Sequence, residues 1–131
     1  YRSLKMKLIA PLLCAAGLLA ASGPLMAQDA DFTLTYHVER TPSARLDIDA
    51  CGDAAMRAAE AAGLISTVQR FPEQLVSVSG GREGEGAYVV QCIAVDDMTV
   101  SVVHGIDYRD QKATMGEFAD AAAEGVAAAA K

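Results

Sequence analysis

The sequence predicts an α+β domain. Its sheet is four-stranded and antiparallel or mixed, in the order β-α-β-β-β-α, with both helices on one face. Two observations predict this class. Short runs of alternating or β-branched residues are separated by glycine, proline and aspartate, as in strands joined by turns. Two alanine-rich segments instead repeat their apolar residues at helical spacing.

The N-terminal segment, residues 1–27, has the layout of a secretory signal peptide. Three basic residues precede an apolar core of 13 residues, positions 8–20, and small residues follow it. That core is shorter than the about 20 apolar residues that a membrane-spanning helix needs. We therefore expect cleavage after Ala27 and a single small exported domain over residues 28–131. Its expected location is periplasmic or secreted, without stable membrane insertion.

The charge balance excludes one class of partner. Residues 28–131 contain eight basic and 17 acidic side chains, a net charge of −9, and no basic cluster. Such a chain repels phosphate backbones, so nucleic-acid binding is excluded. An unknown protein or a small-molecule ligand is the expected partner, and the chain is expected to be a monomer or a homodimer.

Two cysteines, Cys51 and Cys92, remain after the expected cleavage. An even pair in an oxidising compartment predicts a disulfide. A zinc site would need two further ligands, and only His37 and His104 are available for that role. We therefore predict the disulfide, no metal site and no cofactor.

The first strand is expected over residues 31–40, because apolar and polar side chains alternate there. Thr33, Thr35, His37 and Glu39 form the polar side, which is expected to face solvent. The apolar side, expected to be buried, consists of Phe32, Leu34, Tyr36 and Val38.

A helix is expected next. Asp47 or Asp49 can cap its N-terminus, and Gly63 is placed to end it. Its alanine-lined face includes Cys51 in the first turn and extends to Ile65. An alanine face lets a helix lie close to a sheet, so Cys51 is expected to point toward the sheet.

The middle of the chain predicts a loop, a strand and a hairpin. Phe71 and Pro72 indicate a loop, and residues 75–79 indicate a short second strand. Residues 79–86 contain four glycines, but they precede a strand and lack the Lys and Ser/Thr of a phosphate loop. We expect a long hairpin loop there.

The third strand, residues 86–95, is the central one, and residues 98–104 form the fourth. Two registers are possible for this hairpin. A two-residue Asp96-Asp97 turn would place Cys92 opposite Ser101. That register would bury both faces of the sheet and imply a partner subunit or a helix on each side. A three-residue loop gives one coherent apolar face, so we favour it.

The last helix is expected to begin at Thr114, because Thr114 and Glu117 have the spacing of a capping box. Its apolar stripe repeats at helical spacing and predicts packing against the sheet. The members of the stripe are Met115, Phe118, Ala122, Val126 and Ala129.

No catalytic residue is assigned from the sequence. A base needs a partner within hydrogen-bond reach, and Ser101 would face away from His104 in an extended strand. The alternative hypothesis is a small periplasmic enzyme that uses His104 with Asp107 or Tyr108. The acidic pairs near residues 47, 96 and 107 lack the ligand spacing of a calcium loop.

A binding surface is the remaining candidate site. The favoured register would place a row of Thr, Ser and Gln side chains on the outer sheet face: Thr33, Thr35, Ser77, Ser79, Gln91, Thr99 and Ser101. The adjacent loop could contact a partner, because binding residues favour loops on a rigid scaffold. The candidate binding residues are Arg82, Glu83, Glu85 and His104.

The function predicted from these observations is that of a small exported, disulfide-stabilised domain with a non-catalytic binding or accessory role. A homodimeric ligand-binding domain is a further alternative, and the two-residue turn would favour it.

Overall fold

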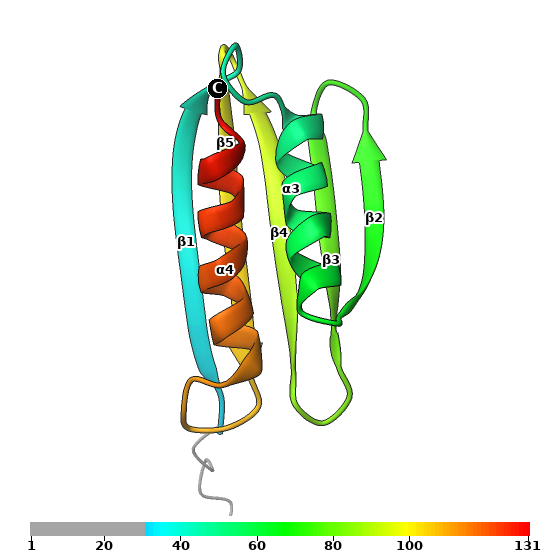
Figure 1. The fold of residues 1–131 in the computed structure, drawn as a ribbon, viewed down its shortest axis with the longest axis vertical. Coiled ribbons are helices and arrows are strands. Elements are labelled where there is room, and N and C mark those ends of the chain that lie inside the picture. The colour runs from blue at the N-terminus through cyan, green and yellow to red at the C-terminus, as the bar shows by residue number, and fades with distance from the viewer. Residues whose placement is uncertain (1–30) are drawn as a thin grey trace, which may run out of the picture. The chain divides into compact units, whose positions relative to one another are not determined.

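The described part of the chain, residues 31–131 of a computed structural model, forms a five-stranded antiparallel sheet with two helices (Figure 1). The predicted signal peptide and its cleavage site lie outside the described residues. The elements in chain order are β1 (Thr33–Pro42), α3 (Ile48–Ala61), β2 (Ile65–Phe71), β3 (Leu75–Arg82), β4 (Gly86–Val95), β5 (Met98–Asp107) and α4 (Thr114–Ala129). Across the sheet the strand order is β1-β5-β4-β3-β2.

The α+β class and the antiparallel sheet are confirmed, but the predicted number of strands and their order are wrong. The additional strand is β2, which lies at one edge of the sheet and pairs only with β3. Its alternation is weak, because both of its sides mix apolar and polar residues. Ile65, expected on the helix, instead opens β2 and is 85% exposed.

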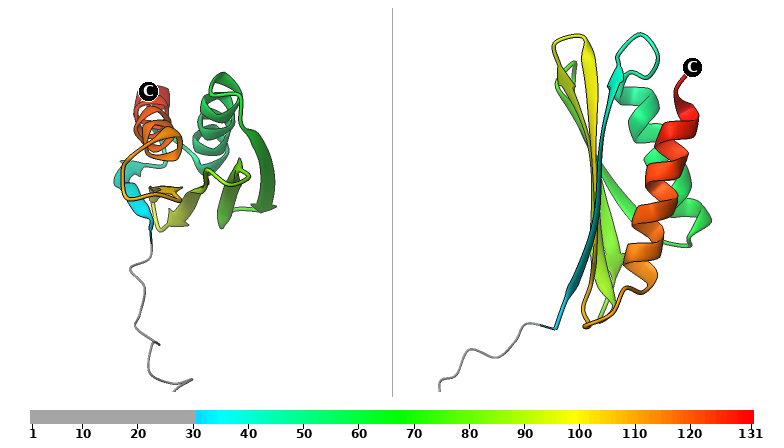
Figure 2. Two further views of the ribbon diagram at one scale, coloured as in Figure 1. Left: turned by 90° about the horizontal axis from the view of Figure 1, so that it is seen from below. Right: turned by 90° about the vertical axis from the view of Figure 1, so that its left-hand side faces the viewer.

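Both helices pack against the same face of the sheet. α4 contacts β1 and β5, while α3 contacts β2, β3 and β4. Figure 2 shows the two helices side by side on that face, and no other described element lies across the opposite face. We call the helix-covered side the inner face and the opposite side the outer face.

The hairpin between β4 and β5 has the two-residue register, so the favoured three-residue loop is wrong. Val95 pairs with Met98 and Cys92 pairs with Ser101. Asp96 adopts a φ of 54°, a left-handed conformation that aspartate tolerates in tight turns. Thr99 and Ser101 are consequently buried on the inner face.

Two residues of β5 explain why this register wins. A side chain at Gly105 would place its Cβ 2.1 Å from the carbonyl oxygen of Met115, so only glycine lets α4 approach β5 there. Asp107, on the same inner side, bonds to the start of α4. A shift of one residue would turn both away from the helix.

In the observed register, the two sides of β1 face the opposite way from the prediction. His37 pairs with Val103 and Thr35 pairs with Gly105, so the polar side of β1 faces the helices. The apolar side lies on the outer face, where it remains exposed. Its members there are Leu34, Tyr36 and Val38.

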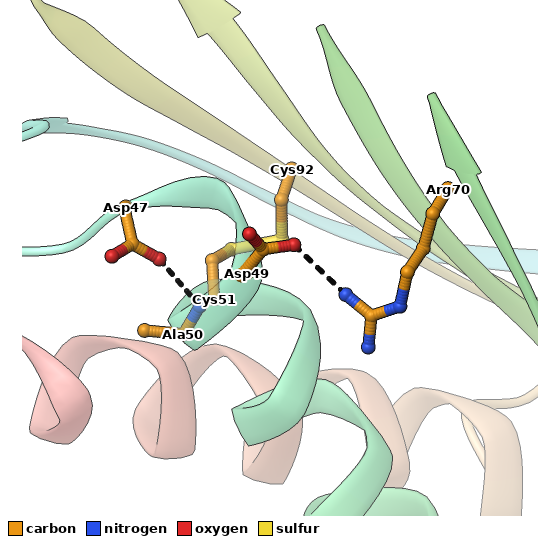
Figure 3. The surroundings of a disulfide bond; sticks show 6 residues. All are labelled: Asp47, Asp49, Ala50, Cys51, Arg70 and Cys92. Atoms are coloured by element: carbon orange, nitrogen blue, oxygen red, sulfur yellow. Dashed lines mark hydrogen bonds and ion pairs between the residues drawn. A yellow bond between two sulfur atoms is a disulfide. The ribbon is translucent and has the colours of Figure 1, made fainter. Parts of the chain in front are cut away.

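The Cys51–Cys92 disulfide is confirmed and joins the first turn of α3 to β4 (Figure 3). The two Cα atoms are 6.1 Å apart, and neither residue is exposed. Asp47 is the N-cap of α3, since its side chain accepts a hydrogen bond from the Ala50 amide at 2.7 Å. Gly63 follows the helix with a φ of 70°, so both predicted ends of α3 are confirmed.

The predicted capping box of α4 is wrong. The N-cap position is Ala113, where no side chain caps the helix. The carboxylate of Asp107, which is 1% exposed, accepts three backbone hydrogen bonds instead. These come from the amides of Ala113 at 2.8 Å, Met115 at 2.9 Å and Gly116 at 3.0 Å. The apolar stripe of α4 packs on the core as expected.

The predicted long loop is instead a three-residue hairpin connection, because β3 continues to Arg82 and β4 begins at Gly86. Gly80 lies in β3 directly beneath Tyr88. A side chain at Gly80 would place its Cβ 2.9 Å from the Tyr88 hydroxyl, so glycine leaves room for the ring. The Tyr88 hydroxyl donates to the Ile65 carbonyl at 3.1 Å, and its ring packs 4.3 Å from the Phe118 ring. Tyr88 therefore ties the edge strand β2 to the core.

Candidate functional site

The outer face is the most distinctive surface of the described domain, because its central strands are mainly apolar there. We call the apolar residues on this face of β1, β5 and β4 the apolar band. Its large members are Leu34, Tyr36, Val38, Met98, Val100, Val102, Ile106, Val89, Ile93 and Val95. The β3 and β2 side of the same face is more polar and includes Ser77, Ser79, Thr67 and Gln69.

The β1 part of the apolar band is unusually exposed for a folded domain, while its members on β5 are half-buried. In β1 alone, Tyr36 is 63% exposed, Val38 is 53% exposed and Leu34 is 46% exposed. Isolated exposed apolar residues are common on proteins, but contiguous exposed apolar patches mark interaction sites. The expected Thr/Ser face is therefore wrong for β1 and β5. It is correct for Ser77, Ser79 and Gln91 on β3 and β4.

The strand residues of the outer face also lack acidic side chains, although the domain is strongly acidic. Within the five described strands the only carboxylates are Glu39 and Asp107. Both occupy inner-face positions, because Glu39 pairs with Ser101 and Asp107 pairs with Thr33. The ionisable side chains on the outer face are Tyr36, Arg40 and His104. Negative charge is therefore absent from the strand positions of the apolar band, while Asp96 and Asp97 of the β4–β5 turn border it in a hollow lined also by Arg40 and Val100.

His104 lies within the outer face, half-buried between Tyr36 on β1 and Val89 on β4. Asp107 lies on the opposite face and is fully engaged by α4. Tyr108 is four residues further along the chain, about 13 Å away in an extended strand. The structure thus does not bring His104 together with either predicted catalytic partner.

The hairpin residues do not join His104 in one site either. Arg82 and Glu85 form an ion pair, with Nε and Oε2 3.4 Å apart, and Glu83 is exposed beside them. Their hairpin continues into Gly86, which pairs with Asp107, three residues from His104. That separation is about 10 Å along the strands.

The acidic pairs have structural roles. Asp47 caps α3, and the Asp49 carboxylate accepts a hydrogen bond from Arg70 of β2 at 2.9 Å (Figure 3). Asp96 forms the tight turn, and Asp107 caps α4. Between residues 31 and 131, no three His, Cys, Asp or Glu side chains are grouped to hold a metal ion.

A polar cluster that the sequence analysis missed links β1 to α4. His37 Nε2 lies 2.8 Å from Asp120 Oδ1, and Lys112 Nζ bonds the other oxygen of the same carboxylate. Lys112, and then His37, lower the pKa of Asp120. The missed signal was the polar side of β1, which was assigned to solvent rather than to α4.

Asp120→Asn should therefore reduce stability slightly at neutral pH and have no effect in strong acid. A carboxyl whose pKa is lowered by folding stabilises the native state above its unfolded pKa, about 3.9. That contribution is lost as the pH falls through the lower folded value. The pairs are exposed, so the effect is small. Urea unfolding between pH 7 and pH 2 measures it, with Glu124→Gln as the matched control; a pH-independent difference would contradict the assignment.

Three hollows of about 290 Å³ or more lie on the helix side of the domain. A groove of about 420 Å³ between α3 and α4 is lined mostly by alanines, with Arg57 at its edge. A second hollow of about 290 Å³ lies at the start of α3, next to Thr99, whose buried hydroxyl has no hydrogen-bond partner in the described domain. The third, of about 350 Å³, lies between β1 and α4 and is lined by His37, Glu39 and Asp120. It is the only one of these three with a histidine, and none of the three contains a cysteine.

Comparison with known proteins identifies the family of the chain. Residues 31–131 match a family described as of unknown function, DUF6180, and the chain belongs to this family. The match spans the whole of the described domain. No curated protein matches the chain. No helix within residues 31–131 is long and apolar enough to cross a membrane.

Proposed function

For this member of the DUF6180 family, we propose a non-catalytic binding role for a small exported, disulfide-stabilised domain, with the outer sheet face as its binding surface. The observation that carries the proposal is the apolar band, which is exposed and free of carboxylates. Burying apolar surface is the main favourable term in protein association. The rest of the domain surface is acidic and hydrated, which favours solubility over binding.

Export is supported by two independent features. The N-terminal sequence has the pattern of a signal peptide, and the domain contains a disulfide, which persists in oxidising compartments. Native mass spectrometry of protein recovered from an exporting bacterial host tests this part. The expected species begins at Gln28 and has lost two hydrogens to the disulfide. A reduced chain that retains residues 1–27 would contradict it.

His104→Ala distinguishes binding from catalysis. Because His104 is half-buried and has no predicted catalytic partner within reach, we expect the change in unfolding free energy to stay within about 0.5 kcal/mol. Because His104 lies on the outer face beside Tyr36, a binding role predicts that any loss of a growth phenotype is accompanied by weaker photo-crosslinking at Tyr36, the experiment described next. Loss of the phenotype at unchanged stability and unchanged crosslinking at Tyr36 would favour the enzyme hypothesis over binding.

Site-specific photo-crosslinking tests the binding surface directly. A benzophenone amino acid replaces Tyr36, on the outer face and 63% exposed, and the chain is irradiated in the exporting host. Tyr108 is the matched control, because it is also an exposed tyrosine, at 54%, but lies beyond the end of β5. Adducts several-fold more abundant at Tyr36 are expected. Equal or absent adducts at the two positions would overturn the proposed surface.

A further inference from the structure

We infer that the partner of the outer face is a second copy of this chain, so that two sheets pack face to face in a twofold homodimer. The inference rests on the proposed function, because it names the occupant of the same surface. Three features of the described domain carry it: the two-sided strand β5, the distribution of charge, and the area of the outer face.

β5 is apolar on the side that the helices do not cover. The two-residue turn places Val100, Val102 and Ile106 on the outer face, while α4 covers Val103 and Gly105 on the inner face. A central strand with apolar side chains outward needs a covering layer on that side. Both described helices are already used on the inner face (Figure 2).

The charge distribution favours a second copy over an unlike partner. A twofold interface places the same patch of both subunits against itself, so a patch with many charges of one sign would repel its copy. The apolar band contains no carboxylate, and Arg40 at its edge is the only outer-face residue of the described strands with a fixed charge, so two copies can meet there with little repulsion. A cationic partner would instead be attracted to the acidic surfaces elsewhere on the domain.

The size and the polarity pattern of the outer face also fit those of a protein–protein interface. β1, β4 and β5 have ten residues each, and β2 and β3 have seven and eight. At a rise of about 3.3 Å per residue and a strand spacing of about 4.8 Å, the face covers about 700 Å². Standard interfaces bury about 800 Å² per partner, with an apolar core and a polar rim. The apolar band would form that core.

Analytical ultracentrifugation of the mature, oxidised protein at micromolar concentration tests the inference. The wild type should sediment as a dimer, and Val38→Glu should weaken self-association at least tenfold, because it places two carboxylates in the interface. Val38 is 53% exposed in a single copy, so its replacement leaves the core intact. Ala121→Glu, which adds the same charge to the exposed side of α4, should leave the dimer unchanged.

A second variant covers the case in which Val38→Glu fails to fold. Val102→Thr keeps the β-branched shape but exposes a hydroxyl, and it should also weaken the dimer. A wild-type monomer, or equal association of the wild type, Val38→Glu and Val102→Thr, would overturn the inference.

The crosslinking experiment separates failure of the dimer from failure of the binding surface. An adduct at Tyr36 with twice the mass of the chain supports the second copy. An adduct of any other mass, together with a monomeric wild type, overturns the dimer but retains the outer face as a binding surface. An absence of adducts specific to Tyr36 overturns both.

Discussion

Cys51→Ala should lower the free energy of unfolding by about 3–4 kcal/mol, the value expected for a disulfide that closes a loop of about 40 residues. The bond joins positions 41 apart in sequence and is the only disulfide between α3 and the sheet among the described residues. For a domain of this size, the loss corresponds to more than 10 °C in melting temperature. Thermal and urea unfolding under oxidising conditions measure it.

Two controls test this prediction, one with reductant and one with a double variant. With excess reductant, the wild type should unfold at nearly the same point as Cys51→Ala. The Cys51→Ala/Cys92→Ala double variant should lose about as much stability as either single variant, because each change breaks the same bond. Additive losses, or a wild type insensitive to reductant, would contradict a stabilising disulfide.

Asp107→Ala should destabilise the domain by about 3–5 kcal/mol, the range for removing one partner from a buried, charged hydrogen-bond cluster. Three amides at the start of α4 would lose their acceptor, and each buried donor without a partner costs about 1–3 kcal/mol. The negative charge also interacts favourably with the N-terminus of the helix. Urea unfolding at neutral pH provides the measurement.

Thr114→Ala is the matched control for Asp107. If a capping box held α4, this change would cost about 1 kcal/mol. Because Thr114 lies within the helix and Asp107 supplies the cap, we expect a change below about 0.5 kcal/mol. A Thr114→Ala loss as large as that of Asp107→Ala would show that the carboxylate is not the main cap.

Features encoded by neighbouring residues could be predicted from the sequence. Asp47 and Gly63 mark the ends of α3 because capping depends on residues within one turn. The disulfide, although it joins residues 41 apart, followed from the count of cysteines together with the expected export. The spacing of the apolar residues of α4 was sufficient to predict which side of the helix meets the sheet.

Features that depend on distant residues could not be predicted. The capping signal at Thr114 was misleading, because the true cap comes from Asp107 on the preceding strand. The side of β1 that faces the helices was misassigned, because we assumed that its apolar side chains are buried within the same chain. The register of β5 depends on the close approach of α4 to Gly105, which no local pattern reports.

The errors in the predicted binding surface have the same origin as these misassignments. His104 was expected to end the fourth strand, whereas β5 continues to Asp107, and the surroundings of His104 depend on which side of the strand faces outward. With the observed register, His104 shares the outer face with Tyr36, and Asp107 lies on the inner face. The apolar band could not be predicted, because its strands were expected to bury those side chains beneath the helices.

The position of β1 in the sheet has a consequence for how an exported chain acquires its structure. Among the described strands, β1 pairs only with β5, and the pairing joins Thr33 to Asp107. A chain that crosses a membrane with its N-terminal part first would deliver β1 early and its partner late. The cysteines can meet once β4 has emerged, so oxidation can precede completion of the sheet. During that delay β1 would be an unpaired strand with apolar side chains, the kind of segment that is prone to aggregate before its partner strand arrives.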